Sequence, residues 1–119
     1  MEIDIANMRR DYRTRRLDHT ALDPDPIRQF AHWFAEAIET QAIDPNAMSI
    51  ASVAADGQPS LRTVLLKYYD ATGFVFYTNL ESRKARQLEE NPNASLLFPW
   101  LSLERQVIVT GSVSRVTTS

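Results

Sequence analysis

The sequence predicts a mainly β protein of the α+β class, built as a small antiparallel barrel. Three observations indicate this class. Five short segments are β-rich, two turn signals (Asp56-Gly57 and the turn at residues 70–73) join neighbouring segments, and two segments have helical spacing. The expected strands are residues 48–55, 62–69, 74–78, 94–98 and 106–113. Strands in meander order, with one helix before them and one inserted, favour a barrel.

The first helix is predicted from its cap and its periodicity. Asp25 is a suitable N-cap, and Pro26 is suited to the first helical position. The residues that follow helical spacing on one face are Ile27, Phe30, Ala31, Phe34, Ala37, Ile38 and Gln41. We interpret this stripe as part of the core. His32 and Trp33 lie near its border and are assigned to packing or to the surface.

The strand at residues 62–69 combines apolar side chains on both faces with two cations, Arg62 and Lys67. Apolar side chains on both faces indicate that both faces contact protein or ligand. A buried cation without a partner costs several kcal/mol or shifts its pKa. The strand therefore predicts an anion nearby.

The inserted helix, predicted at residues 82–90, offers a place for that anion. Ala85 and Leu88 are expected to face inward. Its first turn contains Arg83 and Lys84, and the N–H groups and positive dipole end of a helix favour an anion there. We interpret the region as a phosphate pocket. The alternative is that the strand cations reach solvent at a sheet rim and the helix cations form an ordinary solvated first turn.

Composition excludes several other functions. The 119 residues contain no cysteine, two histidines far apart and three glycines, so thiolate chemistry, a histidine-based metal site, a P-loop and a dinucleotide fingerprint are not expected. The net charge of −2 argues against nucleic-acid binding. Without an apolar stretch of membrane-spanning length or a signal-peptide core, we expect a cytoplasmic protein that does not bind membranes.

Several motifs together resemble a known family. They are Arg-Thr-Val-Leu-Leu-Lys at 62–67, Phe-Tyr-Thr-Asn at 76–79, Ser-Arg-Lys-Ala at 82–85, Ser-Leu-Leu-Phe-Pro-Trp at 95–100 and Leu-Glu-Arg-Gln-Val at 103–107. In this order and register, from about residue 8 to residue 115, they closely resemble the pyridoxamine 5′-phosphate oxidases, which are flavin enzymes that make pyridoxal 5′-phosphate. The resemblance implies an antiparallel split β-barrel that binds flavin mononucleotide (FMN), with an N-terminal helix and one inserted helix.

The resemblance also implies site residues. Arg62, Arg83 and Lys84 would bind the flavin phosphate, main-chain groups along residues 63–66 with Tyr77 and Thr78 would line the ribityl chain and the ring, and Gln106 would be a further flavin contact. The full cofactor set is Arg62, Thr63, Val64, Leu65, Leu66, Lys67, Tyr77, Thr78, Arg83, Lys84 and Gln106. From pattern alone, Gln106 is a polar residue on an exposed strand face. No catalytic residue and no metal ligand is assigned.

Residues 1–25 are predicted to be an N-terminal arm, and residues 26–119 to be the FMN-binding domain. In the arm, five arginines are nearly balanced by six acidic residues, so pattern alone favours a mobile, almost neutral terminus. The resemblance instead implies a segment that closes over the substrate. The substrate residues would be Arg9, Arg10, Asp11 and Tyr12, together with Lys67 near the substrate phosphate.

The implied reaction is the oxidation of pyridoxamine or pyridoxine 5′-phosphate to pyridoxal 5′-phosphate, with O2 as acceptor and H2O2 as product, in a homodimer with its site at the interface. The family has a later segment with further flavin contacts and an Arg-x-His substrate motif, so we interpret the chain as partial and expect little turnover from it alone. Two alternatives stay open: a non-catalytic FMN- or pyridoxal-phosphate-binding split barrel, and a structural barrel without a ligand.

Overall fold

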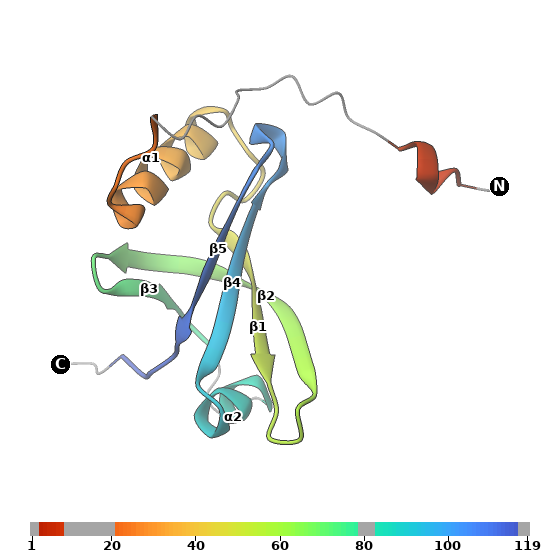
Figure 1. Ribbon diagram of the computed structural model, residues 1–119, viewed down its shortest axis with the longest axis vertical. Coiled ribbons are helices and arrows are strands. Elements are labelled where there is room, and N and C mark those ends of the chain that lie inside the picture. The colour runs from red at the N-terminus through yellow and green to blue at the C-terminus, as the bar shows by residue number, and fades with distance from the viewer. Residues whose placement is uncertain (1–2, 9–20, 79–82, 117–119) are drawn as a thin grey trace.

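The computed structural model describes residues 3–8, 21–78 and 83–116, and Figure 1 shows their arrangement. The helical elements are η1 (Ile5–Asn7), α1 (Pro26–Glu39), α2 (Arg83–Glu90) and η3 (Leu101–Leu103). The strands are β1 (Ala47–Val53), β2 (Pro59–Asp70), β3 (Gly73–Phe76), β4 (Asn93–Trp100) and β5 (Arg105–Ser112). The five expected strands and both expected helices are therefore present, with ends that differ by a few residues.

The strands form one antiparallel sheet with the order β3-β2-β1-β4-β5. The predicted meander order is wrong, because β4 pairs with β1 and not with β3. The Asp56-Gly57 hairpin uses one edge of β1 for pairing with β2, which leaves the other edge open for β4. Helix α2 makes this crossover possible: it carries the chain from β3 to the start of β4, at the end of the sheet where the β1–β2 hairpin turns (Figure 1).

Helix α1 begins as the sequence predicts. Asp25 caps it, because one oxygen of its carboxylate accepts the backbone N–H of Ile27 at 3.0 Å, and Pro26 is the first helical residue. Of the predicted stripe, Phe30 and Ala37 are buried, whereas Ile38 is 57% exposed. The buried part of the stripe is thus narrower than the periodicity indicates.

Phe30 is the centre of an aromatic cluster that joins α1 to the sheet. Its ring centroid lies 4.9 to 5.6 Å from those of its neighbours, four of them in an edge-to-face arrangement. The neighbouring rings are Phe34, Tyr69, Phe74, Phe98 and Trp100. Edge-to-face aromatic pairs add to the stabilisation that burial alone provides. The cluster packs α1 against β2, β3 and β4 at once.

The turn between β2 and β3 is stabilised by Asp70. Its carboxylate accepts the backbone N–H of Thr72 at 2.8 Å and the hydroxyl of Thr72 at 2.6 Å. The hydroxyl first, and then the backbone N–H, lower the pKa of Asp70 below its ordinary value. This bonding explains why the tetrapeptide at residues 70–73 acts as a hairpin turn.

In the part of the chain that the structure describes, no helix is long and apolar enough to cross a membrane.

Replacing Phe30 with Ala should lower the free energy of unfolding by about 3–5 kcal/mol, because it leaves a cavity among the five rings of the cluster. Urea denaturation followed by tryptophan fluorescence measures this change. Ile38→Ala on the same helix is the matched control and should shift stability by less than about 0.5 kcal/mol, since Ile38 is exposed. Equal effects of the two substitutions would contradict the assignment of Phe30 as the central core residue.

Candidate functional site

Strand β2 carries the predicted cations, and the structure corrects the expectation that they are buried. Arg62 and Lys67 are both exposed. Arg62 pairs in register with Ile50, whose side chain is 1% exposed on the inner face of the sheet. Directly opposed residues share a face, so Arg62 belongs to the inner face and reaches solvent near the end of the strand. Because both side chains are exposed, neither needs a partner anion to offset a loss of hydration. Their positive charges are nevertheless available to a ligand.

Lys67 lies at an irregularity in β2. The β2–β3 register shifts between Leu66 and Tyr68, which places Lys67 in a β-bulge. Bulges redirect side chains and occur frequently beside active sites. Beyond the bulge, Tyr69 packs against the core, whereas Tyr68 is 59% exposed. A hollow of about 280 Å³ lies at this position, lined by Phe34, Leu66, Lys67, Tyr68 and Tyr69.

The remaining predicted cofactor residues have different environments. Val64 and Leu66 are buried in the core, so only their main-chain groups could contact a ligand. Thr63, Leu65, Tyr77 and Gln106 are exposed, and Thr78 is half-buried after the end of β3. Arg83 and Lys84 are the first two residues of α2, and their side chains lie outside what the structure describes. Arg9, Arg10, Asp11 and Tyr12 lie outside the described residues.

A hydrogen-bonded cluster of three polar side chains, which sequence reasoning missed, joins α2 to strands β1 and β2. The Ser60 hydroxyl donates to Oε1 of Gln87 at 2.7 Å. The Ser52 hydroxyl lies 3.1 Å from that of Ser60 and 3.4 Å from the same Oε1 atom. A sequence signal existed: alternation places Ser52 on the same face as Met48 and Ile50, where a polar residue needs a hydrogen-bond partner.

The start of β5 is anchored to α1 through Arg105. Its guanidinium donates to a carboxylate oxygen of Glu36 at 2.8 Å and lies 4.8 Å from the centroid of the Trp33 ring. Both charged side chains are mostly buried, which strengthens the pair relative to an exposed one. Glu104, in the left-handed conformation (φ 55°), ends η3 just before β5. The next residue after Arg105 is Gln106, which the strand alternation points to the opposite, exposed face.

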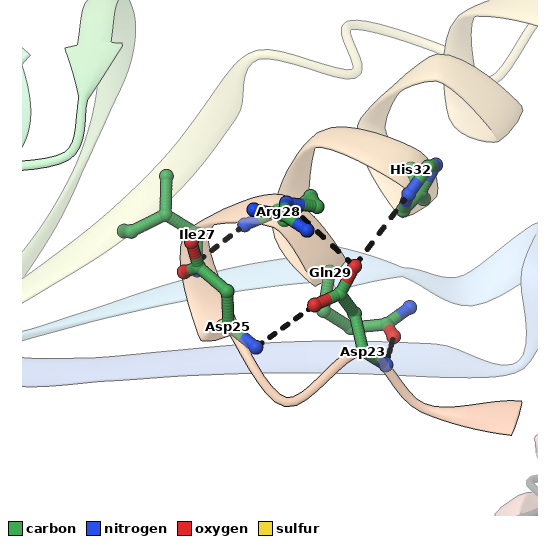
Figure 2. Close-up of polar contacts among 6 residues, drawn as sticks. All are labelled: Asp23, Asp25, Ile27, Arg28, Gln29 and His32. Carbon is green, nitrogen blue, oxygen red and sulfur yellow. Dashed lines mark hydrogen bonds and ion pairs between the residues drawn. The ribbon is translucent and has the colours of Figure 1, made fainter. Parts of the chain in front are cut away.

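A second hollow, of about 450 Å³, lies between α1, the segment before it and Arg105. Figure 2 shows the polar contacts on one side of it. Asp23 accepts the backbone N–H of Asp25 at 2.8 Å, and its other oxygen lies 3.9 Å from Nε of Arg28 and 4.0 Å from Nε2 of His32. His32 is exposed, as assigned from the sequence. These contacts fix the entry into α1.

A family model described as pyridoxamine 5′-phosphate oxidase matches residues 34–119. The chain belongs to this family. Two relatives named pyridoxine/pyridoxamine 5′-phosphate oxidase, from Aliarcobacter butzleri and Rippkaea orientalis, are each 52% identical to it over 117 residues. Each alignment covers 98% of this chain and 55% of the relative. The chain thus spans about half the length of the curated relatives it matches.

Solved structures support the predicted split-barrel fold. The chain is similar to PhzG from Burkholderia lata 383, in complex with tetrahydrophenazine-1-carboxylic acid, with a TM-score of 0.78 and 29% identity over 83% of this chain and 50% of that chain. It also resembles a pyridoxamine 5′-phosphate oxidase-related, FMN-binding protein from Nostoc punctiforme, with a TM-score of 0.65 and 21% identity over 77% of this chain and 47% of that one. The second likeness shows the fold alone. The antiparallel split barrel with an N-terminal and an inserted helix is confirmed.

Proposed function

We propose that the chain binds FMN and contributes to the oxidation of pyridoxamine or pyridoxine 5′-phosphate to pyridoxal 5′-phosphate, with O2 as acceptor and H2O2 as product. Membership of the family and relatives named as oxidases support an oxidoreductase. The observation that carries the proposal is that Gln87 of helix α2 is hydrogen-bonded to Ser60 of β2, two residues before the exposed Arg62 on the same face of the strand. This arrangement suits a terminal phosphate.

The proposed roles follow from the position of each residue. Arg62 would hold the phosphate together with Arg83 and Lys84, since guanidinium groups and helix N–H groups suit a phosphate dianion. Main-chain groups along residues 63–66, with Tyr77 and Thr78, would orient the rest of the cofactor. Because the side chains of Val64 and Leu66 are packed in the core, the backbone of β2 is held in a fixed position from which its polar groups could contact the cofactor.

Gln106 is proposed as a further flavin contact. Arg105 supports this role, because its contacts with Glu36 and Trp33 fix the start of β5 and hence the exposed position of Gln106. FMN would supply the redox chemistry by accepting a hydride from the substrate. Lys67, redirected by the bulge, would bind the substrate phosphate, and Arg9, Arg10, Asp11 and Tyr12 would cover the substrate.

Activity can be tested in a chimera that joins this chain to the part of the Aliarcobacter butzleri relative that the alignment does not cover. We expect mass spectrometry of the released ligand to show FMN, and the chimera to produce H2O2 with pyridoxamine or pyridoxine 5′-phosphate but not with unphosphorylated pyridoxine. Bound FMN without peroxide would favour the non-catalytic binding module. A chimera without flavin would contradict both proposals.

Arg62→Ala and Lys84→Ala should each weaken FMN binding by roughly tenfold or more, because a charge-assisted hydrogen bond contributes about 1.5–3 kcal/mol. Flavin fluorescence quenching measures the affinity. Arg86→Ala is the matched control, since it removes an exposed cation from the same helix outside the proposed pocket. If both pocket variants bind FMN as tightly as the parent chain, the phosphate lies elsewhere.

A homodimer is proposed through the outer face of the sheet. Leu61 and Ile108 are 71% and 61% exposed there, and Leu97, directly opposite Ile108, lies on the same face. Exposed apolar side chains gathered on one face are typical of an interface, which in a stable dimer buries about 800 Å² per partner.

Leu61→Glu combined with Ile108→Glu should convert the dimer to a monomer, because it places one negative charge on β2 and one on β5 in the proposed interface. Light scattering coupled to size-exclusion chromatography measures the mass. Ile43→Glu, in the loop between α1 and β1 and 93% exposed, is the control and should leave the mass unchanged. A parent chain that is monomeric at all concentrations would exclude this interface.

A further inference from the structure

The cluster of Ser52, Ser60 and Gln87 is an internal attachment between helix α2 and the sheet. Ser52 is 3% exposed, so its hydroxyl depends on protein partners for hydrogen bonds. Ser60 sits directly opposite it in the β1–β2 register. Gln87 comes from the middle of α2 and accepts through a single oxygen, Oε1. One side chain of the helix is therefore linked to both β1 and β2.

The hydrogen-bond geometry assigns a direction to each contact. An amide oxygen is an acceptor only, so the serines must donate toward Gln87. Ser60 makes the short bond of 2.7 Å, and Ser52 is placed to donate to the Ser60 oxygen at 3.1 Å while lying 3.4 Å from Oε1. Because each hydroxyl has one hydrogen, this chain of donors fixes the position of Oε1 relative to the two strands. Side-chain contacts of this kind fix both the height and the rotation of the helix on the sheet.

The cluster connects the two elements that carry the proposed phosphate pocket, β2 and α2. On β2, Ser60 is two residues before Arg62, and the two side chains share a face of the strand. On α2, Gln87 is one helical turn after Arg83 and Lys84. We propose that Gln87 is a positioning residue, which sets the distance between Arg62 and the first turn of α2 so that both contact one phosphate group. This inference rests on the proposed function.

The physical reason is the short range of charge-assisted hydrogen bonds. Their N–O distances are about 2.7–2.9 Å, so a helix that moves by about 1 Å loses contacts made from the strand and the helix together. Ala85 and Leu88 also hold α2 on the sheet by burial, but apolar contacts are non-directional and permit such a movement. Loss of the Gln87 contacts should therefore weaken phosphate binding more than it weakens the fold.

The test compares FMN with riboflavin, which has the same ring and ribityl chain but no phosphate. Gln87→Leu keeps the approximate size of the side chain and removes the acceptor. We expect the affinity of the 119-residue chain for FMN to fall about tenfold, while its affinity for riboflavin changes by less than about twofold. A merely structural role would lower both affinities equally, so the ratio of the two dissociation constants isolates positioning.

Matched variants complete the experiment. Ser60→Ala should lower the FMN-to-riboflavin preference in the same direction, and Ser60→Thr should restore it, because threonine keeps the donor hydroxyl. Gln58→Leu is the control: this glutamine lies in the β1–β2 hairpin and bonds only its neighbour, Pro59, through its side-chain amide among the described residues. It should leave the preference unchanged. Circular dichroism checks folding, and if Gln87→Leu is unfolded, the Ser60 pair decides the result.

The outcomes separate this inference from the function on which it rests. A parent chain that binds FMN no more tightly than riboflavin would overturn the proposed phosphate pocket and the inference with it. A parent chain that prefers FMN, with the same preference in Gln87→Leu and Ser60→Ala, would overturn the inference alone. A lowered preference in both variants, restored by Ser60→Thr, supports it.

Discussion

Strand β1, at the centre of the sheet, limits where every other element can lie. It pairs with β2 on one edge and with β4 on the other, and Met48 and Ile50 on its inner face are each 1% exposed. A strand buried in this way needs hydrogen bonds along both edges, since unpaired backbone groups are costly in the core. The pairing with β4 forces the chain to cross from β3 back to β1. Helix α2 makes this crossing, and so comes to lie beside the end of β2.

Helices α1 and α2 are each packed on the sheet by apolar side chains and oriented by a polar one. Helix α1 packs through Phe30 and is oriented by the ion pair between Glu36 and Arg105. Helix α2 packs through Leu88 and is oriented by Gln87. Burial supplies most of the stabilisation but little direction, whereas a hydrogen bond or ion pair in a partly buried site fixes geometry. The polar attachments lie next to the residues proposed to hold the cofactor.

The two strand cations of the candidate site are exposed rather than buried. Arg62 and Lys67 keep their hydration in the absence of a ligand, so the fold is not destabilised by desolvated cations. The bulge at Lys67 and the position of Arg62 near the strand end direct these side chains without burying them. A ligand that carries a phosphate would then supply the negative charge that pairs with these cations. This explains why the cations are accessible to solvent before a ligand binds.

Local chemistry in the sequence determined the elements and several of their ends. Asp25 and Pro26 specify the start of α1, and Asp56-Gly57 specifies the first hairpin. Ala85 and Leu88 specify the inward face of α2. These features could be predicted because caps, turns and periodicity act between residues that are close in the chain. Five motifs, at residues 62–67, 76–79, 82–85, 95–100 and 103–107, together indicated the family, which the comparisons confirm.

How these elements meet could not be derived from local sequence, because it depends on long-range contacts in the folded chain. The pairing of β4 with β1 joins segments that are far apart in the chain. The same is true of the contacts of Ser52 and Ser60 with Gln87 and of Glu36 with Arg105. The exposure of Arg62 and Ile38 depends on which other elements cover each face. Alternation can indicate that Ser52 points inward, but it cannot identify the hydrogen-bond partner of Ser52. Long-range pairing depends on which strand edges and helix or sheet faces are still unpaired once the local elements have formed. It is therefore determined by the assembled core and not by any one segment.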